Sequence, residues 1–343
     1  MKNIFVSVLL IFSGMLFALD KESYNALLSI DSAPIKPVDL CISFFTKNIK
    51  DVPLNADGMS IVGREYECYN NVLEAIRTNS VSKVKPYLYE FSNDKKKRLT
   101  AQINLLNKYW VNISSKTSPR LVKIVNFGDN NVFFLRVPNK NNSGYLVLYI
   151  HTRKISGSDF WIWSGAETNQ PALSLITYLL MEKDISQVKS DNYKNSLPLT
   201  GGENGIILYF NGKKVFVNLD EKNNDSPLLS FCHNAFVGIK ENFDSYPSFF
   251  SQFVSQKIAE DIKKNKLTQQ YLQNEWNKAN RLIYIIDASP MYIILYEYPG
   301  INSITPRFVY NNGQRYYFVN SFDINPLSEI LMNNRKAIID PSH

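Results

Sequence analysis

Two stretches of the chain share one pattern of hydrophobic and polar positions. Residues 120–138 and residues 281–299 each begin with Arg-Leu, continue as a β-branched apolar run, break at a polar turn and end in a second apolar run before proline. Apolar runs on both sides of a turn predict a β-hairpin in each stretch. Corresponding positions lie 161 residues apart, so the pattern predicts an internal duplication that sets the architecture of the chain.

Similar elements are predicted around each hairpin. Apolar positions at helical spacing predict three helices before the hairpin, and apolar runs predict two more strands after it. The predicted helices are 66–77, 81–91 and 94–110 in the first half, and 228–240, 246–264 and 267–279 in the second. The predicted later strands are 144–153 and 160–163, then 304–310 and 316–319.

The segments upstream of the helices are also predicted to match. Strands are expected at residues 40–45 and 206–210, after a helix-like lead-in over residues 19–36. Asn211-Gly212 and Asn312-Gly313 lie between apolar runs and predict tight hairpin turns, because both turn residues adopt positive φ. The first of these turns would return as a strand over residues 215–219.

These elements predict an α+β protein of two repeated units, each with helices packed on a curved antiparallel sheet. The predicted boundaries are a signal peptide (1–18), a first unit (19–182), a linker (183–194), a second unit (195–332) and a frayed C-terminal tail (333–343). The apolar run over residues 4–17 is too short to cross a membrane as a helix, follows Lys2 and precedes a small residue, Ala18. We therefore expect a soluble protein that is secreted or periplasmic.

Charge and cysteine content limit the classes of function. The net charge is +7, but the basic residues are scattered. The densest run, residues 95–98, lacks interleaved aromatic residues and fits a solvated helix face better than a nucleic-acid site. Of the three cysteines, Cys68 and Cys232 occupy matching repeat positions, which favours buried helix residues over a disulfide between them. The redox state of Cys41, Cys68 and Cys232 stays open. No cofactor or metal site is predicted.

One strand face carries the candidate chemistry. Alternation places Tyr145, Tyr149, His151 and Arg153, with Val147, on one face of the strand 144–153. It places Leu146, Leu148 and Ile150 on the other face. The aliphatic face should pack on helices. Together with Trp161 and Trp163 of the next strand, the polar face would form a ligand platform of aromatic and charged groups. A solvated outer face or a contact between the units is the alternative.

In the second half, Glu297 faces Arg307 and Arg315 of later strands as a candidate charged site, but cross-strand ion pairs account for such charges more simply. The sequence contains no GxSxG, HExxH, Walker loop or GxGxxG pattern.

Helices followed by a meander of long strands resemble the NTF2-like (cystatin-like) α+β superfamily. The segments that carry the resemblance are residues 66–110 with 120–163, and residues 228–279 with 281–319. The resemblance implies a bent sheet that wraps a helix and encloses a pocket. It assigns no catalytic residue, and the strand before the first helix departs from the simplest family pattern.

Three functions remain open at this stage. The first is a non-catalytic protein of the bacterial envelope that binds a small molecule or a partner protein. The second is a pocket enzyme with His151 as general base and Tyr149 or Arg153 as the orienting group, since a histidine can titrate near neutral pH. The third is a structural or interaction protein with exposed aromatic sheet faces.

Overall fold

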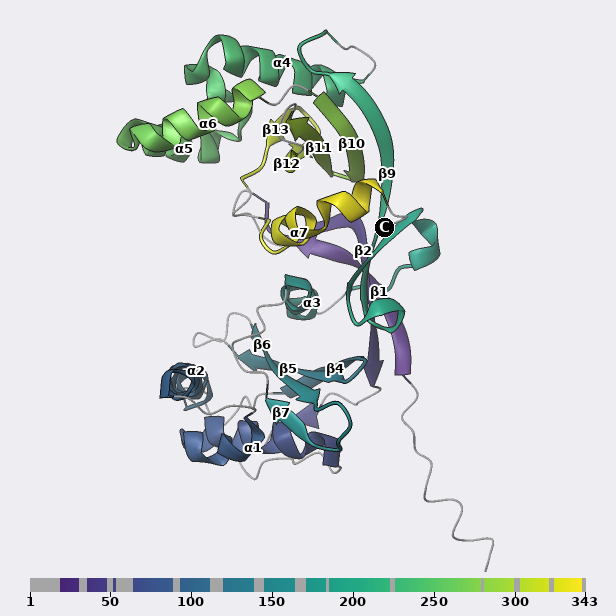
Figure 1. Cartoon of the computed structure of the whole chain (residues 1–343), viewed down its shortest axis with the longest axis vertical. Helices are drawn as coiled ribbons and strands as arrows, with labels where there is room; N and C mark the ends of the chain where they lie inside the picture. Colours follow the sequence, from purple (N-terminus) through teal and green to yellow (C-terminus); the bar gives the residue numbers. More distant parts are fainter. Residues whose placement is uncertain are drawn as a thin grey trace, which may run out of the picture. The chain divides into compact units, whose positions relative to one another are not determined.

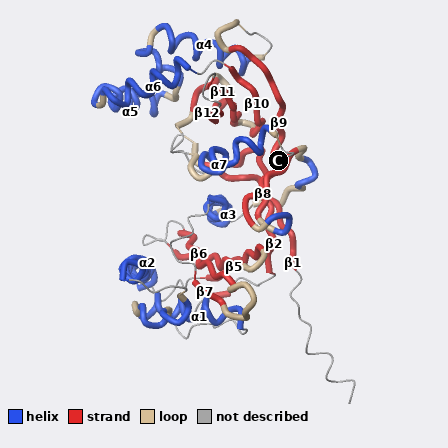
Figure 2. Tube along the Cα trace, viewed as in Figure 1, coloured by secondary structure: helices blue, strands red, loops and turns tan. Residues whose placement is uncertain are grey.

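The computed structural model describes residues 19–30, 36–47, 52–53, 64–88, 93–111, 120–138, 145–163, 171–182, 185–222, 226–278, 281–298, 303–320 and 324–340. The predicted signal peptide, 1–18, lies outside these residues. The chain forms helices and extensive antiparallel sheet (Figures 1 and 2), so the α+β class is confirmed. Within the described residues, no helix combines the length and apolar character needed to span a membrane.

The chain divides into two compact units. Unit 1 comprises Met1–Glu22, Phe44–Asn169 and Gly201–Ile206; unit 2 comprises Ser23–Ser43, Gln170–Thr200 and Ile207–His343. The strand β2 (Lys36–Lys47) contributes residues to both. The helix α3 (Pro171–Met181) groups with unit 2 and packs against its C-terminal helix, although the sequence places it at the end of the first unit.

Unit 1 contains an antiparallel sheet in the order β2-β4-β5-β6-β7, with the short β3 beside β4. Its strands after β2 are β3 (Val52–Pro53), β4 (Arg120–Phe127), β5 (Asn130–Pro138), β6 (Tyr145–Lys154) and β7 (Trp161–Trp163). The helices α1 (Arg64–Thr78) and α2 (Asn93–Val111) pack together on this sheet (Figure 1). Their buried faces carry Tyr69, Val72, Leu99 and Ile103.

Residues 81–88, the described part of the helix predicted over 81–91, do not form an α-helix. Two 3₁₀ turns, η1 (Val81–Lys83) and η2 (Lys85–Tyr87), take its place. Pro86 explains the difference, because proline lacks the amide hydrogen and its ring clashes with the preceding helical turn.

Unit 2 contains an antiparallel sheet in the order β2-β9-β10-β11-β12-β13, with β1 beside β2 and β8 beside β9. Its strands are β1 (Leu19–Leu28, shared with unit 1), β8 (Asn195–Thr200), β9 (Ile206–Asn218), β10 (Arg281–Ala288), β11 (Met291–Tyr298), β12 (Ser303–Asn311) and β13 (Tyr316–Phe318). The lead-in predicted as helix-like is therefore a strand that pairs with β2.

Helices cover both faces of the unit 2 sheet. One face packs on α4 (Pro227–Glu241), the 3₁₀ segment η6 (Phe243–Phe249), α5 (Gln252–Lys264) and α6 (Lys266–Lys278). On this face Ile294, Tyr296 and Tyr298 are at most 2% exposed. A further helix, α7 (Leu327–Ile339), packs along β12. It continues through most of the predicted C-terminal tail, and Ile338 is buried.

The turn predicted at Asn211-Gly212 is wrong. Strand β9 runs straight through both residues from Ile206 to Asn218 and pairs with β10 along that part. A Cβ atom on Gly212 would lie 2.5 Å from Cε1 of Tyr284 on β10. Glycine is present because an aromatic ring of the neighbouring strand lies over the backbone. The turn predicted at Asn312-Gly313 is confirmed, with Gly313 at φ +90° between β12 and β13.

Both predicted hairpins are confirmed, and each contains a register irregularity near its start. In the β4–β5 hairpin the register shifts between Leu121 and Lys123. In the β10–β11 hairpin it shifts between Leu282 and Tyr284. An extra residue in one strand of a pair is a β-bulge, which increases the local twist.

Candidate functional site

Strand β6 separates its side chains as the alternation predicts. Ile150 and Leu148 belong to the core beneath α1 and α2, so the aliphatic face packs on helices as predicted. His151 and Tyr149 stand on the other face, opposite Val132 and Phe134 of β5. At the ends of the strand, Tyr145 is 38% exposed and Arg153 is also exposed.

His151 is engaged inside the protein. It is 2% exposed, and its Nε2 atom lies 2.9 Å from Oδ1 of Asn130, in position to donate a hydrogen bond. The Phe127 ring lies beside it, 5.7 Å between centroids. Burial, with a smaller contribution from the positive charge of Arg153, lowers the pKa of His151 to about 4. The ring is therefore neutral at pH 7 and its Nε2 already has a partner.

Trp161 and Trp163 do not join this polar face. Trp163 pairs with Thr152 and Trp161 with Lys154, which places both indoles on the helix side of the sheet. Trp163 is 4% exposed and belongs to the core of unit 1, and the partly buried Trp161 packs against that core. The predicted six-residue platform is therefore split between two faces. The prediction assumed a register between the two strands that differs from the actual one by one residue. A shift of one residue moves every side chain of a strand to the opposite face of the sheet.

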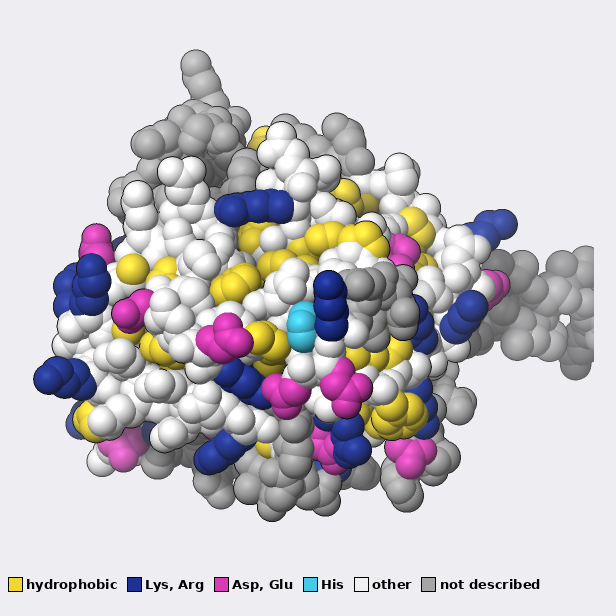
Figure 3. Space-filling view, turned by 90° about the horizontal axis from the view of Figure 1, so that it is seen from above, with side chains coloured by type: hydrophobic (Ala, Val, Ile, Leu, Met, Phe, Trp, Pro, Cys, Tyr) yellow, Lys and Arg dark blue, Asp and Glu magenta, His cyan; other side chains and the backbone are white. Residues whose placement is uncertain are grey.

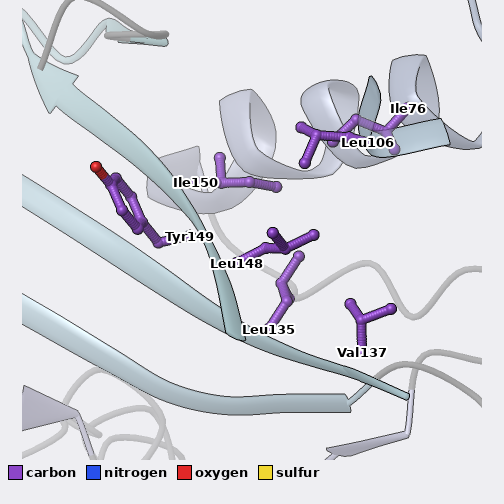
Figure 4. A pocket seen from close by; sticks show the side chains of 7 residues that line it. All are labelled: Ile76, Leu106, Leu135, Val137, Leu148, Tyr149 and Ile150. Atoms are coloured by element: carbon purple, nitrogen blue, oxygen red, sulfur yellow. The ribbon is translucent and has the colours of Figure 1, made fainter. Parts of the chain in front are cut away.

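A small cavity lies between β5, β6 and the helices of unit 1 (Figure 4). Six of its seven lining residues are aliphatic, and Tyr149 directs its hydroxyl away from them. The aliphatic lining residues are Ile76, Leu106, Leu135, Val137, Leu148 and Ile150. The space available inside is about 10 Å³, room for roughly one water molecule and far below the volume of a typical ligand pocket.

A polar hollow of about 300 Å³ lies at the surface of unit 1, lined by residues 154–159 with Asp129. Lys154 and Asp159 form an ion pair there, with 3.2 Å between Nζ and Oδ1. Across the described part of the chain, no group of three or more His, Cys, Asp or Glu side chains is placed to hold a metal ion.

The charged residues of unit 2 pair differently from the prediction. Glu297 stands opposite Arg281 on β10 and accepts a hydrogen bond of 2.8 Å from Nε of Arg281. Glu297 therefore takes part in a cross-strand ion pair, but with Arg281 and not with Arg307 or Arg315. Arg315 is exposed and donates to the carbonyl of Phe250. Basic and acidic side chains mix on the molecular face in Figure 3, and Lys96, Lys97 and Arg98 are exposed on α2 as expected.

Arg307 instead faces the helix side of the unit 2 sheet. It pairs with Ile294 across β11 and β12, and so projects from the same face as Ile294 and Tyr296. Its guanidinium carbon lies 3.8 Å from the centre of the Trp276 ring and 5.3 Å from that of Tyr296. Trp276 and Tyr296 are both 0% exposed. Arginine stacked on aromatic faces is stabilised by cation–π attraction, which is stronger away from water.

Unsatisfied polar atoms occur in both units of the described chain, and those of unit 2 belong to this arginine and to aromatic residues near it. Among the described residues, buried side-chain atoms without a hydrogen-bond partner include Trp276 Nε1, Tyr296 Oη, Tyr298 Oη and Arg307 Nε. We call these four residues the Arg307 cluster. Each such atom, left dry, costs about 1–3 kcal/mol. Four of them together would approach the entire net stability of a domain, about 5–15 kcal/mol. A cluster of this kind is therefore expected to be satisfied by water or by a bound molecule.

Neighbouring groups influence the charge of the cluster. Burial lowers the pKa of Arg307, while Tyr246 and then Glu275 act in the opposite direction. Burial raises the pKa of Tyr298, and nearby Glu275 raises it further. Arg307 is partly exposed as a residue, although its Nε atom is buried. The arrangement can bind a polar group but contains no base paired with a nucleophile.

Sequence reasoning considered Arg307 only as half of a surface ion pair. Its inward position follows from strand alternation once the register of β12 against β11 is known, because residues opposite Ile294 share its buried face. Trp276 offered the other signal, since it is the one fully buried residue of α6, all of whose residues the structure describes. Comparison of the chain with protein-family models, with curated proteins and with solved structures found no match.

Proposed function

We propose that the chain is a non-catalytic binding protein that acts outside the cytoplasm, and that it takes up a small molecule in unit 2. The observation that carries this proposal is the Arg307 cluster, four buried and unsatisfied polar atoms around one stacked guanidinium. Well-folded interiors rarely leave such atoms without partners. Export rests on the apolar segment 4–17 near the N-terminus.

The two units are proposed to be degenerate copies of one ancestral unit. The register shifts at Leu121/Lys123 and Leu282/Tyr284 support this, because they lie at corresponding positions 161 residues apart. In both halves helices precede the hairpin and two further strands follow it. Bulges are specific local features, so their recurrence favours duplication over a coincidence of composition.

The resemblance to the NTF2-like superfamily is retained as part of the proposal. In each unit the helices that precede the hairpin pack on one face of the antiparallel sheet, which supports it. The resemblance implies a pocket in each unit. In unit 1 this pocket would be nearly filled by aliphatic side chains. In unit 2 it would contain the Arg307 cluster. Binding would then belong to unit 2 only.

An interaction role is a second candidate with one observation in its favour. Leu267 and Tyr271 of α6 are 77% and 64% exposed and lie four residues apart, on the same side of the helix. The enzyme hypothesis based on His151 has less support, since that side chain is buried and hydrogen-bonded to Asn130.

Native mass spectrometry of the purified chain tests the binding function. We expect a small molecule to remain bound under gentle conditions and to be lost on denaturation. Turnover of substrates from a broad hydrolase panel that disappears in His151→Ala would refute the non-catalytic proposal. A monodisperse dimer or hetero-complex without any bound small molecule would favour the interaction role instead.

A further inference from the structure

The unsatisfied atoms of the Arg307 cluster have one chemical character. Trp276 Nε1 and Arg307 Nε can only donate hydrogen bonds, and the hydroxyls of Tyr296 and Tyr298 can donate as well. A molecule that satisfies all four must therefore bring acceptor atoms. Because one donor belongs to a guanidinium, a negatively charged acceptor is favoured over a neutral one.

The Nε atom of the Arg307 guanidinium is available for such a molecule, although the side chain also forms a hydrogen bond with Tyr246. Ion pairs join several charged side chains of the described residues, but none of them includes Arg307. Glu275 on α6 is close enough to favour the charged form of Arg307 without forming an ion pair with it in the described structure. Arginine binds carboxylates through two parallel hydrogen bonds when its planar fork is free.

The surroundings of the cluster are aromatic, and an exposed tyrosine lies near it. The Phe236 ring lies 4.6 Å, and the Phe318 ring 5.4 Å, from that of Trp276 between centroids. Tyr271, which is 64% exposed, is near enough to influence the pKa values of both Arg307 and Tyr298. Arg307 is partly exposed as a residue, whereas its Nε atom is buried.

We propose that unit 2 binds a carboxylate-bearing ligand with an aromatic or flat apolar body, and that the Arg307 fork and the donors of Trp276, Tyr296 and Tyr298 hold the carboxylate. This inference rests on the proposed binding function and assigns its ligand class. The carboxylate can belong to a simple organic acid or to an amino acid. In the second case Glu275 would accept a hydrogen bond from the ammonium group.

The test is isothermal titration calorimetry of the full chain at constant pH and ionic strength with benzoate, benzamide and phenylalanine. Benzoate and benzamide have the same shape and differ in charge. We expect benzoate to bind at one site per chain, and benzamide to bind about 10- to 100-fold more weakly, the factor for losing charge-assisted hydrogen bonds. Tighter binding of phenylalanine than of benzoate, lost in Glu275→Gln, would identify the amino acid as the source.

Two variants assign the site. Arg307→Gln should weaken benzoate binding about 10-fold or more, whereas Arg315→Gln, which removes the same charge from an exposed arginine of the same unit, should leave binding unchanged. If Arg307→Gln fails to fold, Arg307→Lys keeps the charge, loses the planar fork and should still weaken binding. Equal affinity for benzoate and benzamide, or binding that survives both Arg307 variants, would overturn the ligand class. Retention of some other small molecule in native mass spectrometry would refute the ligand class but support the binding function. If neither native mass spectrometry nor calorimetry detects a bound molecule, the ligand class and the binding function are both refuted.

Discussion

Gly212 offers a direct test of how the unit 2 sheet is built. The residue lies in the middle of β9, opposite Ile286 of β10, and not in a turn. A Cβ atom at this position would lie 2.5 Å from Cε1, 2.6 Å from Oη and 2.9 Å from Cζ of Tyr284. The informative perturbation is therefore Gly212→Ala, made in the native chain and in a chain that also carries Tyr284→Val.

The expected magnitude follows from two opposing effects. In a strand, replacing glycine by alanine removes backbone freedom from the unfolded chain and stabilises by about 0.5–1 kcal/mol. The Tyr284 ring must move to admit the new methyl group, and it is only 4% exposed. Overpacking of a well-packed interior costs about 1–3 kcal/mol. The net result should be a loss of about 1–2 kcal/mol in the native background.

The double-mutant cycle isolates the contact between the two residues. In the Tyr284→Val background the aromatic ring is absent, so Gly212→Ala should be neutral or stabilising by up to about 1 kcal/mol. The coupling energy would then be about 1–3 kcal/mol. Urea unfolding followed by far-ultraviolet circular dichroism supplies the four free energies of unfolding, provided the slopes agree.

A different outcome would refute the argument. A glycine in a hairpin turn at positive φ loses stability on substitution whatever stands at position 284. Equal destabilisation by Gly212→Ala in both backgrounds would therefore show that β9 turns at Asn211-Gly212. The control is Gly313→Ala, at a residue with φ +90° where an added Cβ would have no atom within 4 Å. It should lose stability equally in both backgrounds.

Three further predictions concern buried groups. The pKa of His151 is lowered from 6.5 to about 4. Between these pH values the unfolded chain binds a proton on this residue and the folded chain does not. The free energy of unfolding should therefore fall by up to about 3 kcal/mol as the pH decreases through this window. His151→Gln should remove that part of the pH dependence in urea titrations, and an unchanged profile would contradict the burial of the ring. Cys41, Cys68 and Cys232 form no disulfide and are 0% exposed, and burial raises the pKa of Cys232 to about 12. A thiol reagent at pH 8 should therefore label them only after denaturation, and rapid labelling of the native chain would contradict this. Trp163→Ala should cost about 3–5 kcal/mol as a core truncation. Tyr145→Ala, at a 38% exposed residue near Arg136, should cost about 1 kcal/mol or less. Similar losses for the two variants in urea unfolding would show that both aromatics belong to one surface.

Particular elements illustrate how far the candidate site could be predicted. Alternation along residues 145–154 correctly placed Leu148 and Ile150 against the helices and His151 opposite them. It could not place Trp161 and Trp163, because alternation within a strand says nothing about its register with the next strand. The same limit hid Arg307, whose charge indicated the surface while its register with Ile294 directed it into the core.

The sequence by itself determined the local structure of this protein. Periodicity of apolar residues was enough for the α+β class, the β4–β5 and β10–β11 hairpins and the principal helices, since these depend on neighbours along the chain. Only the tertiary structure decided which residues pair and make contact between neighbouring strands. Asn211-Gly212 has the local chemistry of a turn, yet β10 pairs along it and Tyr284 fills the space above Gly212. Pairing between distant strands outweighs a two-residue preference, and it also assembled Trp276, Tyr296, Tyr298 and Arg307 into the cluster on which the proposed function depends.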